Sequence, residues 1–294
     1  MTARHLFSSI LFMTIALAAP GCALEAGNDQ VDGDAFSVSL DPMGGFHDPT
    51  ELPPGSTNGW YPKCFWDSHS LNGLRQYSQK ALWSDAQHGD YSLPPNAQID
   101  ALSADCRTQA LQYLVRCALP KDTYAIDPLS GDKIPGWLGV TPRWAEEPLS
   151  SDDEWWMTSC LTQHINGYGA EIALELDGLN SALLPPHKDD SNFPWLDSHT
   201  YGNIFVANVD VRRLVVYACH DKNLRQRCAS SSALTKRICD DDPSIGCNLV
   251  ITGACETACT WSTTELAYSC GAAGFRNIGS RLKSDEMYRG VECR

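Results

Sequence analysis

The chain has 294 residues, of which 43% are hydrophobic and 20% charged, and its 36 acidic and 22 basic side chains give a formal net charge of −14. Such a surface repels phosphate backbones and anionic headgroups, which argues against nucleic-acid binding and against membrane attachment through surface charge. After residue 22 no stretch of 18 uninterrupted apolar residues occurs, so we predict no membrane-spanning segment there.

The first 22 residues are typical of an export signal. A short basic start is followed by a mainly apolar run over residues 6–19 and by small residues that lead to Cys22. A cysteine at this place resembles the lipobox of bacterial lipoproteins, in which the cysteine becomes the N-terminus and its thiol carries a diacylglyceryl group. Ala19 stands where the lipobox usually has Leu. We expect residues 1–21 to be a signal peptide and Cys22 the lipid attachment site; the alternative is an ordinary signal peptide and a freely secreted protein.

The number of cysteines fits a lipid on Cys22. An exported protein with 13 cysteines should have one that is outside its intramolecular bridges, and Cys22 is the natural choice. The remaining twelve would form six disulfides. These are Cys64, Cys106, Cys117, Cys160, Cys219, Cys228, Cys239, Cys247, Cys255, Cys259, Cys270 and Cys293. Ala23 stands where the inner-membrane retention signal of enteric lipoproteins has Asp, which favours the outer membrane of the cell envelope as the location.

The mature chain is expected to begin with a tether. Residues 22–59 are rich in Gly, Asp, Pro and Ser and have no sustained period of 2 or 3.6, which is typical of a flexible segment. Such a tether has a typical end-to-end distance of about 35 Å. Residues 60–294 are predicted to form a disulfide-stabilised globular body, with a possible sub-boundary near residue 169.

The clearest predicted helix covers residues 105–119, where apolar residues repeat at helical spacing, Asp105 can cap the start and Pro120 stops the end. Cys106 and Cys117 are separated by about 16 Å along this helix. The Cα atoms of a disulfide must approach to about 4.4–6.8 Å, so these two cysteines cannot pair with each other.

A second helix is predicted over residues 152–166. It starts with the capping-box spacing of Ser151 and Glu154 and ends at Gly167 as a left-handed stop. This helix carries Cys160, so the two cysteines of the first helix would pair with Cys64 and Cys160. We favour Cys117 with Cys160 and Cys64 with Cys106; the exchanged pairing is nearly as acceptable.

The second half has strand patterns. Residues 170–176 alternate, which predicts a half-buried strand with its glutamates facing solvent, and residues 204–209 and 214–219 are predicted to form a hairpin. Residues 219–293 combine dense cysteines with short strands such as 248–252, a composition typical of small secreted modules. We therefore predict a loop-rich α+β fold, with a helical first half followed by a disulfide-rich β part of small strands.

Two groups of residues could carry metal or acid/base chemistry. Cys255 and Cys259, with Cys247, Cys270 and His220 nearby, are potential zinc ligands, but cysteines at this density in an oxidising compartment favour disulfides. We therefore predict no metal site and no cofactor.

The other group has two imidazoles and three carboxylates within 13 residues, in the segments 186–190 and 197–199. Solvated loop residues are the favoured interpretation. The run 240–242 lacks the spacing of a calcium loop and is predicted to be an exposed turn. Because G-x-S-x-G, H-E-x-x-H and C-x-x-C-H motifs are also absent, we assign no catalytic residue.

Tryptophan is abundant. Exposed indoles can stack on sugar rings or anchor a protein partner, although core packing is the commoner role. The nine are Trp60, Trp66, Trp83, Trp137, Trp144, Trp155, Trp156, Trp195 and Trp261.

Several runs of sequence are characteristic. They are Ala110–Pro120, Gly136–Trp144, Ser159–Gly169 and Tyr201–Phe205, with Tyr217–Cys219 after them. Together they resemble a set of uncharacterised, cysteine-rich envelope lipoproteins from myxobacteria and related bacteria, over most of residues 100–294. The resemblance implies an envelope location and implies no activity. The leading hypothesis is a lipid-anchored extracytoplasmic protein that binds or scaffolds a glycan or a protein; the alternative is a secreted or surface hydrolase acting on glycan or peptide.

Overall fold

The computed structural model describes residues 56–85, 90–168, 172–183, 193–222, 231–240 and 242–282. All of them belong to one compact unit, residues 35–294. The expected signal peptide, Cys22, most of the tether, residues 186–190, Cys228 and Cys293 lie outside the described residues. Within these ranges, none of the helices combines the length and the apolar character that a membrane crossing requires.

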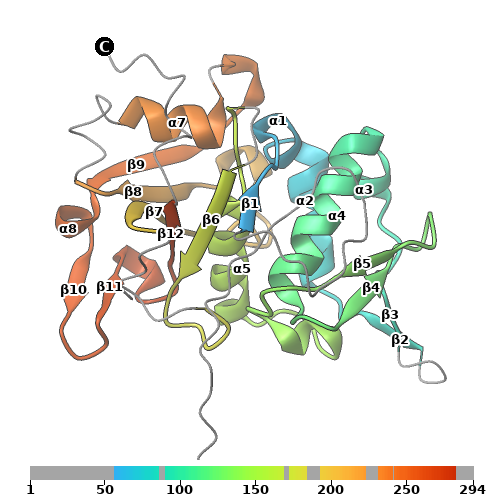
Figure 1. Ribbon diagram of the computed structural model, residues 1–294. Helices are drawn as coiled ribbons and strands as arrows, with labels where there is room; N and C mark the ends of the chain where they lie inside the picture. Colours follow the sequence, from blue (N-terminus) through green and yellow to red (C-terminus); the bar gives the residue numbers. More distant parts are fainter. Residues whose placement is uncertain are drawn as a thin grey trace, which may run out of the picture. The chain divides into compact units, whose positions relative to one another are not determined.

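The fold is α+β, as predicted, and is organised around a six-stranded mixed sheet with the order β1-β6-β12-β7-β8-β9 (Figure 1). Neighbouring strands are antiparallel except β8 and β9, which are parallel. The strands are β1 (Ser56–Asn58), β6 (Ile172–Asp177), β7 (Trp195–Gly202), β8 (Val216–His220), β9 (Leu249–Ala254) and β12 (Ile278–Leu282). The tether was expected to end at residue 59, but its last residues already form the edge strand β1.

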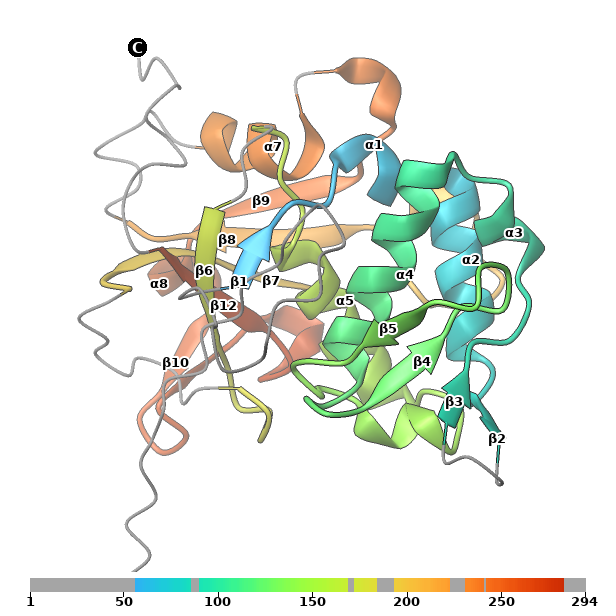
Figure 2. The ribbon, with the colours of Figure 1, turned by 45° about the vertical axis from the view of Figure 1, so that its right-hand side comes forward.

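Two smaller sheets accompany the large one. One has four short strands, β2 (Trp83–Asp85), β3 (Asp90–Ser92), β4 (Tyr124–Ile126) and β5 (Lys133–Pro135); the other is the hairpin of β10 (Thr260–Ser262) and β11 (Ala267–Ser269). Figure 2 shows the four-stranded sheet beside α4, on the far side of α4 from the large sheet.

The longer helices of the described residues are divided equally between the two halves of the chain, so the predicted order of helices first and strands last is found only in part. The α-helices are α1 (Pro62–Phe65), α2 (Ser68–Ser78), α3 (Ala97–Asp100), α4 (Ala104–Ala118), α5 (Ser151–Gln163), α7 (Ser231–Cys239) and α8 (Cys255–Ala258), and four 3₁₀ turns cover Pro142–Ala145, Val211–Arg213, Pro243–Ile245 and Gly271–Ala273. Helix α5 packs both on β7 and β12 and on α4, so it lies between the large sheet and α4 (Figure 1). The main hydrophobic core draws residues from both sides of position 169.

Helix α4 matches the predicted helix closely, and its apolar stripe is buried. The cap differs: the Ser103 hydroxyl accepts a hydrogen bond from the Cys106 N–H, and Asp105 lies in the first turn. Both residue types can cap, so the sequence pattern alone does not choose between positions two residues apart.

Helix α5 begins one residue earlier and ends three residues earlier than predicted. Its capping box joins Ser150 and Asp153, and its C-cap is His164. Gly167 is not in the left-handed region, so the predicted left-handed stop is wrong. The glycine is needed for close approach, since a Cβ there would lie 2.4 Å from the backbone oxygen of Lys236 in α7.

The strand β6 is not half-buried as predicted. Glu175 is 1% exposed and Asp177 is 2% exposed, so polar and apolar faces are both covered. The predicted hairpin is also wrong in its first strand: β8 pairs with β7, and residues 204–209 form a loop in which Ile204 and Phe205 are buried. Apolar residues buried in a loop imitate a strand pattern, because burial alone does not determine backbone conformation.

Candidate functional site

Ten of the twelve cysteines expected to form bridges are joined in five disulfides. These are Cys64–Cys106, Cys117–Cys160, Cys219–Cys255, Cys239–Cys247 and Cys259–Cys270. The first two are the favoured pairing of the sequence, and they fasten α4 to α1 and to α5 respectively. Cys255, Cys259, Cys247 and Cys270 are thus in disulfides, and His220 bonds through Nδ1 to the backbone oxygen of Asp221.

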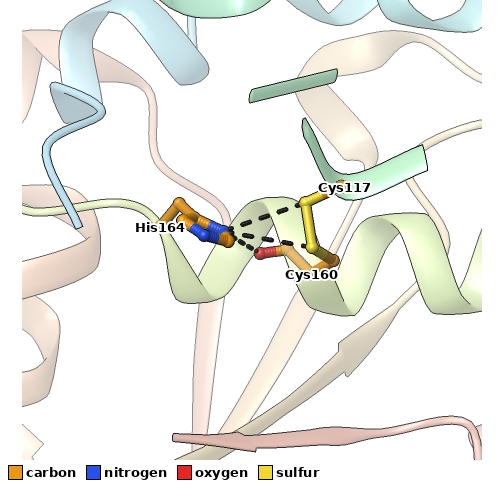
Figure 3. A group of neighbouring side chains, drawn as sticks. All are labelled: Cys117, Cys160 and His164. Carbon is orange, nitrogen blue, oxygen red and sulfur yellow. Dashed lines mark hydrogen bonds between the residues drawn. A yellow bond between two sulfur atoms is a disulfide. The ribbon is translucent and has the colours of Figure 1, made fainter. Parts of the chain in front are cut away.

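One disulfide has an imidazole beside it (Figure 3). His164 Nδ1 lies 3.8 Å from Cys117 Sγ and 4.0 Å from Cys160 Sγ. The same nitrogen is 2.8 Å from the backbone oxygen of Cys160. Nδ1 therefore carries the proton and donates a hydrogen bond to this oxygen in the last turn of α5. Burial lowers the pKa of His164 to about 4, so the ring is neutral at pH 7. Two thiolates and an imidazole at this spacing could hold a metal ion, but here both sulfurs are bonded to each other.

Asp197, Ser198 and His199 are not in a solvated loop, contrary to the prediction. They lie in the middle of β7 and are at most 2% exposed. The strand has a β-bulge: Ser198 pairs with Ser280 while Leu196 pairs with Arg281, which leaves Asp197 as the extra residue. This strand could not be predicted from apolar alternation, because several of its buried positions are polar.

The bulge directs Asp197 to the side of the sheet where Ser198 and Ser280 lie. Its Oδ2 accepts hydrogen bonds from both hydroxyls, at 3.0 and 2.9 Å, and lies 3.2 Å from the guanidinium of Arg237. Arg237 is fully buried in α7 and also donates to the backbone oxygens of Gln163, the last residue of α5, and of Ile165 just after it. This ion pair therefore joins α5, α7 and the sheet.

His199 faces the opposite side of the sheet, since adjacent strand residues alternate. Its Nδ1 is 3.0 Å from Asn277 Oδ1, and the Asn277 amide nitrogen donates to the backbone oxygens of Tyr268 and Gly274. These two bonds fix the amide oxygen toward the imidazole, so Nδ1 must carry the proton and Nε2 has the lone pair. Among the described residues Nε2 has no hydrogen-bond partner. Burial lowers the pKa of His199 to about 4, which keeps the ring neutral at pH 7.

A glycine makes room for this ring. Gly279 pairs with His199 on one side and with Asp177 on the other, so the three residues form one row across β6, β12 and β7. A Cβ on Gly279 would lie 2.1 Å from Asp177 Oδ1 and 2.7 Å from His199 Cε1. The imidazole and the carboxylate therefore meet above the glycine. Sequence reasoning missed this site because it depends on sheet register; a glycine between Ile278 and Ser280 in a strand is the signal that could have indicated it.

The nine tryptophans divide by exposure. Trp60, Trp66 and Trp144 are buried, as core packing predicts, whereas Trp83, Trp195 and Trp261 are 57%, 37% and 38% exposed. Trp137, Trp155 and Trp156 are half-buried.

Trp83 lies on the outer face of the four-stranded sheet. Strand register places it in one row with Ser92, Ile126 and Lys133, while Ala125 and Ile134 are buried on the inner face. We call this row of four residues the outer platform. Lys133, the last member of this row, contacts two further side chains. Its Nζ is 3.9 Å from the ring centroid of Tyr124, 2.6 Å from the Tyr124 hydroxyl and 4.0 Å from the Asp90 carboxylate.

Comparisons of the chain with protein-family models, with curated proteins and with solved structures find no match.

Proposed function

We propose that the chain is a lipid-anchored protein of the bacterial cell envelope that binds a glycan outside the cytoplasm. The five disulfides support an oxidising compartment, because such bridges persist in exported proteins and are rare in the cytosol. The cysteine count and the sequence before Cys22 support the anchor. Ala23, which stands where an inner-membrane retention signal has Asp, supports attachment to the outer membrane through the lipid.

The observation that carries the binding role is the exposed indole of Trp83. A side chain of this size is usually placed in a core or an interface, and here 57% of it faces solvent on a sheet surface. An indole offers a flat apolar face to a sugar ring. Asp90 on the adjacent strand β3 and Lys133 on the far edge strand β5 offer an acceptor and a donor to hydroxyls farther along a glycan chain. A glycan fits this combination better than a wholly apolar ligand does.

A glycan array, followed by fluorescence titration of the strongest ligand, tests the binding role. Trp83→Ala should weaken binding about tenfold or more through lost stacking. Trp261→Ala is the matched control, since it removes another exposed indole on a different sheet. The absence of glycan binding by the unaltered protein, or a loss confined to the Trp261 variant, would contradict the proposal.

The anchor is tested by mass spectrometry of the protein isolated from its native membrane. We expect Cys22 at the N-terminus with a diacylglyceryl mass, and Cys22→Ala should move the protein to the soluble fraction. An unmodified chain that starts before residue 22 would contradict the anchor and leave the glycan proposal standing.

A hydrolase acting on glycan or peptide is the second candidate, and the lone pair on His199 Nε2 is the observation that favours it. A neutral imidazole held by an amide oxygen is oriented as a general base requires. His199→Gln should then abolish hydrolysis of peptidoglycan or casein by the purified protein. If the unaltered protein hydrolyses neither substrate, the binding role stands alone.

A further inference from the structure

Two disulfides of the second half lie against each other beside the hairpin of β10 and β11. Cys219 Sγ of the Cys219–Cys255 bridge is 3.9 Å from Cys259 Sγ of the Cys259–Cys270 bridge. The sulfurs of Cys219, Cys259 and Cys270 all lie within 4.8 Å of one another. We call the four cysteines of these two bridges the sulfur quartet. Three of them are fully buried, and Cys259 is 9% exposed.

Thiol–disulfide exchange needs only a thiolate that can reach the sulfur of a disulfide. A separation of 3.9 Å is close to van der Waals contact, so a thiolate at Cys259 would already lie against its target, Cys219 Sγ. Cys270 Sγ lies within 4.8 Å of the same atom. Whichever partner of the Cys259–Cys270 bridge is released, its sulfur is therefore next to Cys219.

We propose that the sulfur quartet is a thiol–disulfide exchange site that accepts a low-molecular-weight thiol at Cys259 and releases a thiol at Cys255. In the first step the external thiolate bonds to Cys259 Sγ, and the Cys259–Cys270 bond breaks with its electron pair on Cys270. In the second step the Cys270 thiolate bonds to Cys219 Sγ, and the Cys219–Cys255 bond breaks. Cys255 leaves as a thiolate and takes a proton from solvent. One thiol enters and one thiol leaves, so no oxidant or reductant is needed.

The exchange would change what the bridges hold together. Cys255 is the first residue of α8, and its bridge ties that helix to β8. After exchange, α8 loses this tie and carries the thiol next to the exposed Glu256 and Thr257. Cys270, just after β11, becomes linked to β8 instead (Figure 1). The exchange thus moves the free thiol from Cys270 to Cys255, which is the first residue of α8 and is itself fully buried.

Single cysteine variants of the full-length protein test the contact directly. Cys270→Ser leaves a thiol at Cys259, and Cys259→Ser leaves one at Cys270. After incubation at pH 8, the samples are denatured in N-ethylmaleimide and mapped by mass spectrometry without reductant. We expect the label at Cys255 in both variants, together with a Cys219–Cys259 or a Cys219–Cys270 linked peptide. Label only at Cys259 or only at Cys270, with Cys219–Cys255 intact, would overturn the proposal.

Cys160→Ser provides the control. It frees Cys117, which is equally buried but whose neighbouring group contains His164 and no second disulfide. Its label should stay at Cys117.

If a cysteine variant forms different bridges during folding, the unaltered protein can be used to test the exchange instead. Limiting glutathione is added to the folded protein, which is then trapped and mapped in the same way. A glutathione adduct at Cys259 together with a labelled Cys255 would support the exchange. An adduct at Cys259 together with a labelled Cys270 would contradict it.

Discussion

At the residue scale, the two buried histidines should make the protein sensitive to acid. Burial lowers the pKa of His164 and His199 from 6.5 to about 4, so between these pH values the unfolded chain binds protons that the folded chain does not. The free energy of unfolding therefore falls as pH drops from 6.5 to 4, by on the order of 2–3 kcal/mol for each histidine. Urea unfolding at several pH values measures this fall. It should be smaller in His164→Gln/His199→Gln, and an unchanged slope would contradict the assignment.

The buried ion pair should respond strongly to loss of one partner. Arg237→Met removes the guanidinium that faces the Asp197 carboxylate, and we expect a loss of about 3–5 kcal/mol in unfolding free energy. Arg212→Met is a suitable control, because its guanidinium is 82% exposed beside Asp210 and solvent screens the pair, so this change should cost far less stability than Arg237→Met. Replacing both partners, as Arg237→Met/Asp197→Leu, should cost less than Arg237→Met alone. A loss below about 1 kcal/mol in Arg237→Met would contradict a structural role for the pair.

At the scale of elements, Trp60 lies in the short connection between β1 and α1. The indole is fully buried, stacks on Tyr113 at 5.3 Å and meets Phe65 edge-on at 5.0 Å. The backbone N–H of Trp60 donates a hydrogen bond to the backbone oxygen of His164, which ties this connection to the end of α5. Trp60→Ala should cost about 3–5 kcal/mol of stability. Trp83→Ala, which removes an exposed indole, should stay within about 0.5 kcal/mol, and equal losses would contradict the difference in burial.

Helices were easier to predict from the sequence than strands, for a physical reason. The apolar stripe and the Pro120 stop specify α4 locally, and the structure moves its ends by only one residue. In β6 and β7 the buried positions include Glu175, Asp197 and His199, whose burial depends on partners far along the chain. The row of Asp177, Gly279 and His199 is a consequence of strand register, so no local pattern could predict it.

At the scale of the whole molecule, the bridges connect neighbouring layers of the fold. Cys117–Cys160 joins α4 to α5, which itself packs on the sheet, and Cys239–Cys247 joins the end of α7 to the segment before β9. Each closes a loop and so removes conformational freedom from the unfolded chain. Cross-links of this kind suit a protein that functions outside the cytoplasm, where unfolded chains are not rescued by cytosolic chaperones.

The cysteine count gives the last prediction. With a lipid on Cys22 and ten cysteines in the five described bridges, Cys228 and Cys293 are the two that remain of the thirteen. Both lie outside the described residues, and the count predicts that they pair, because an exported protein rarely keeps free thiols. Peptide mapping without reductant should find a linked peptide containing both residues and no free thiol in the unfolded protein. A free thiol at Cys228 would contradict this pairing, and a free thiol at Cys22 would show that the lipid is absent and that the odd cysteine is the N-terminal one.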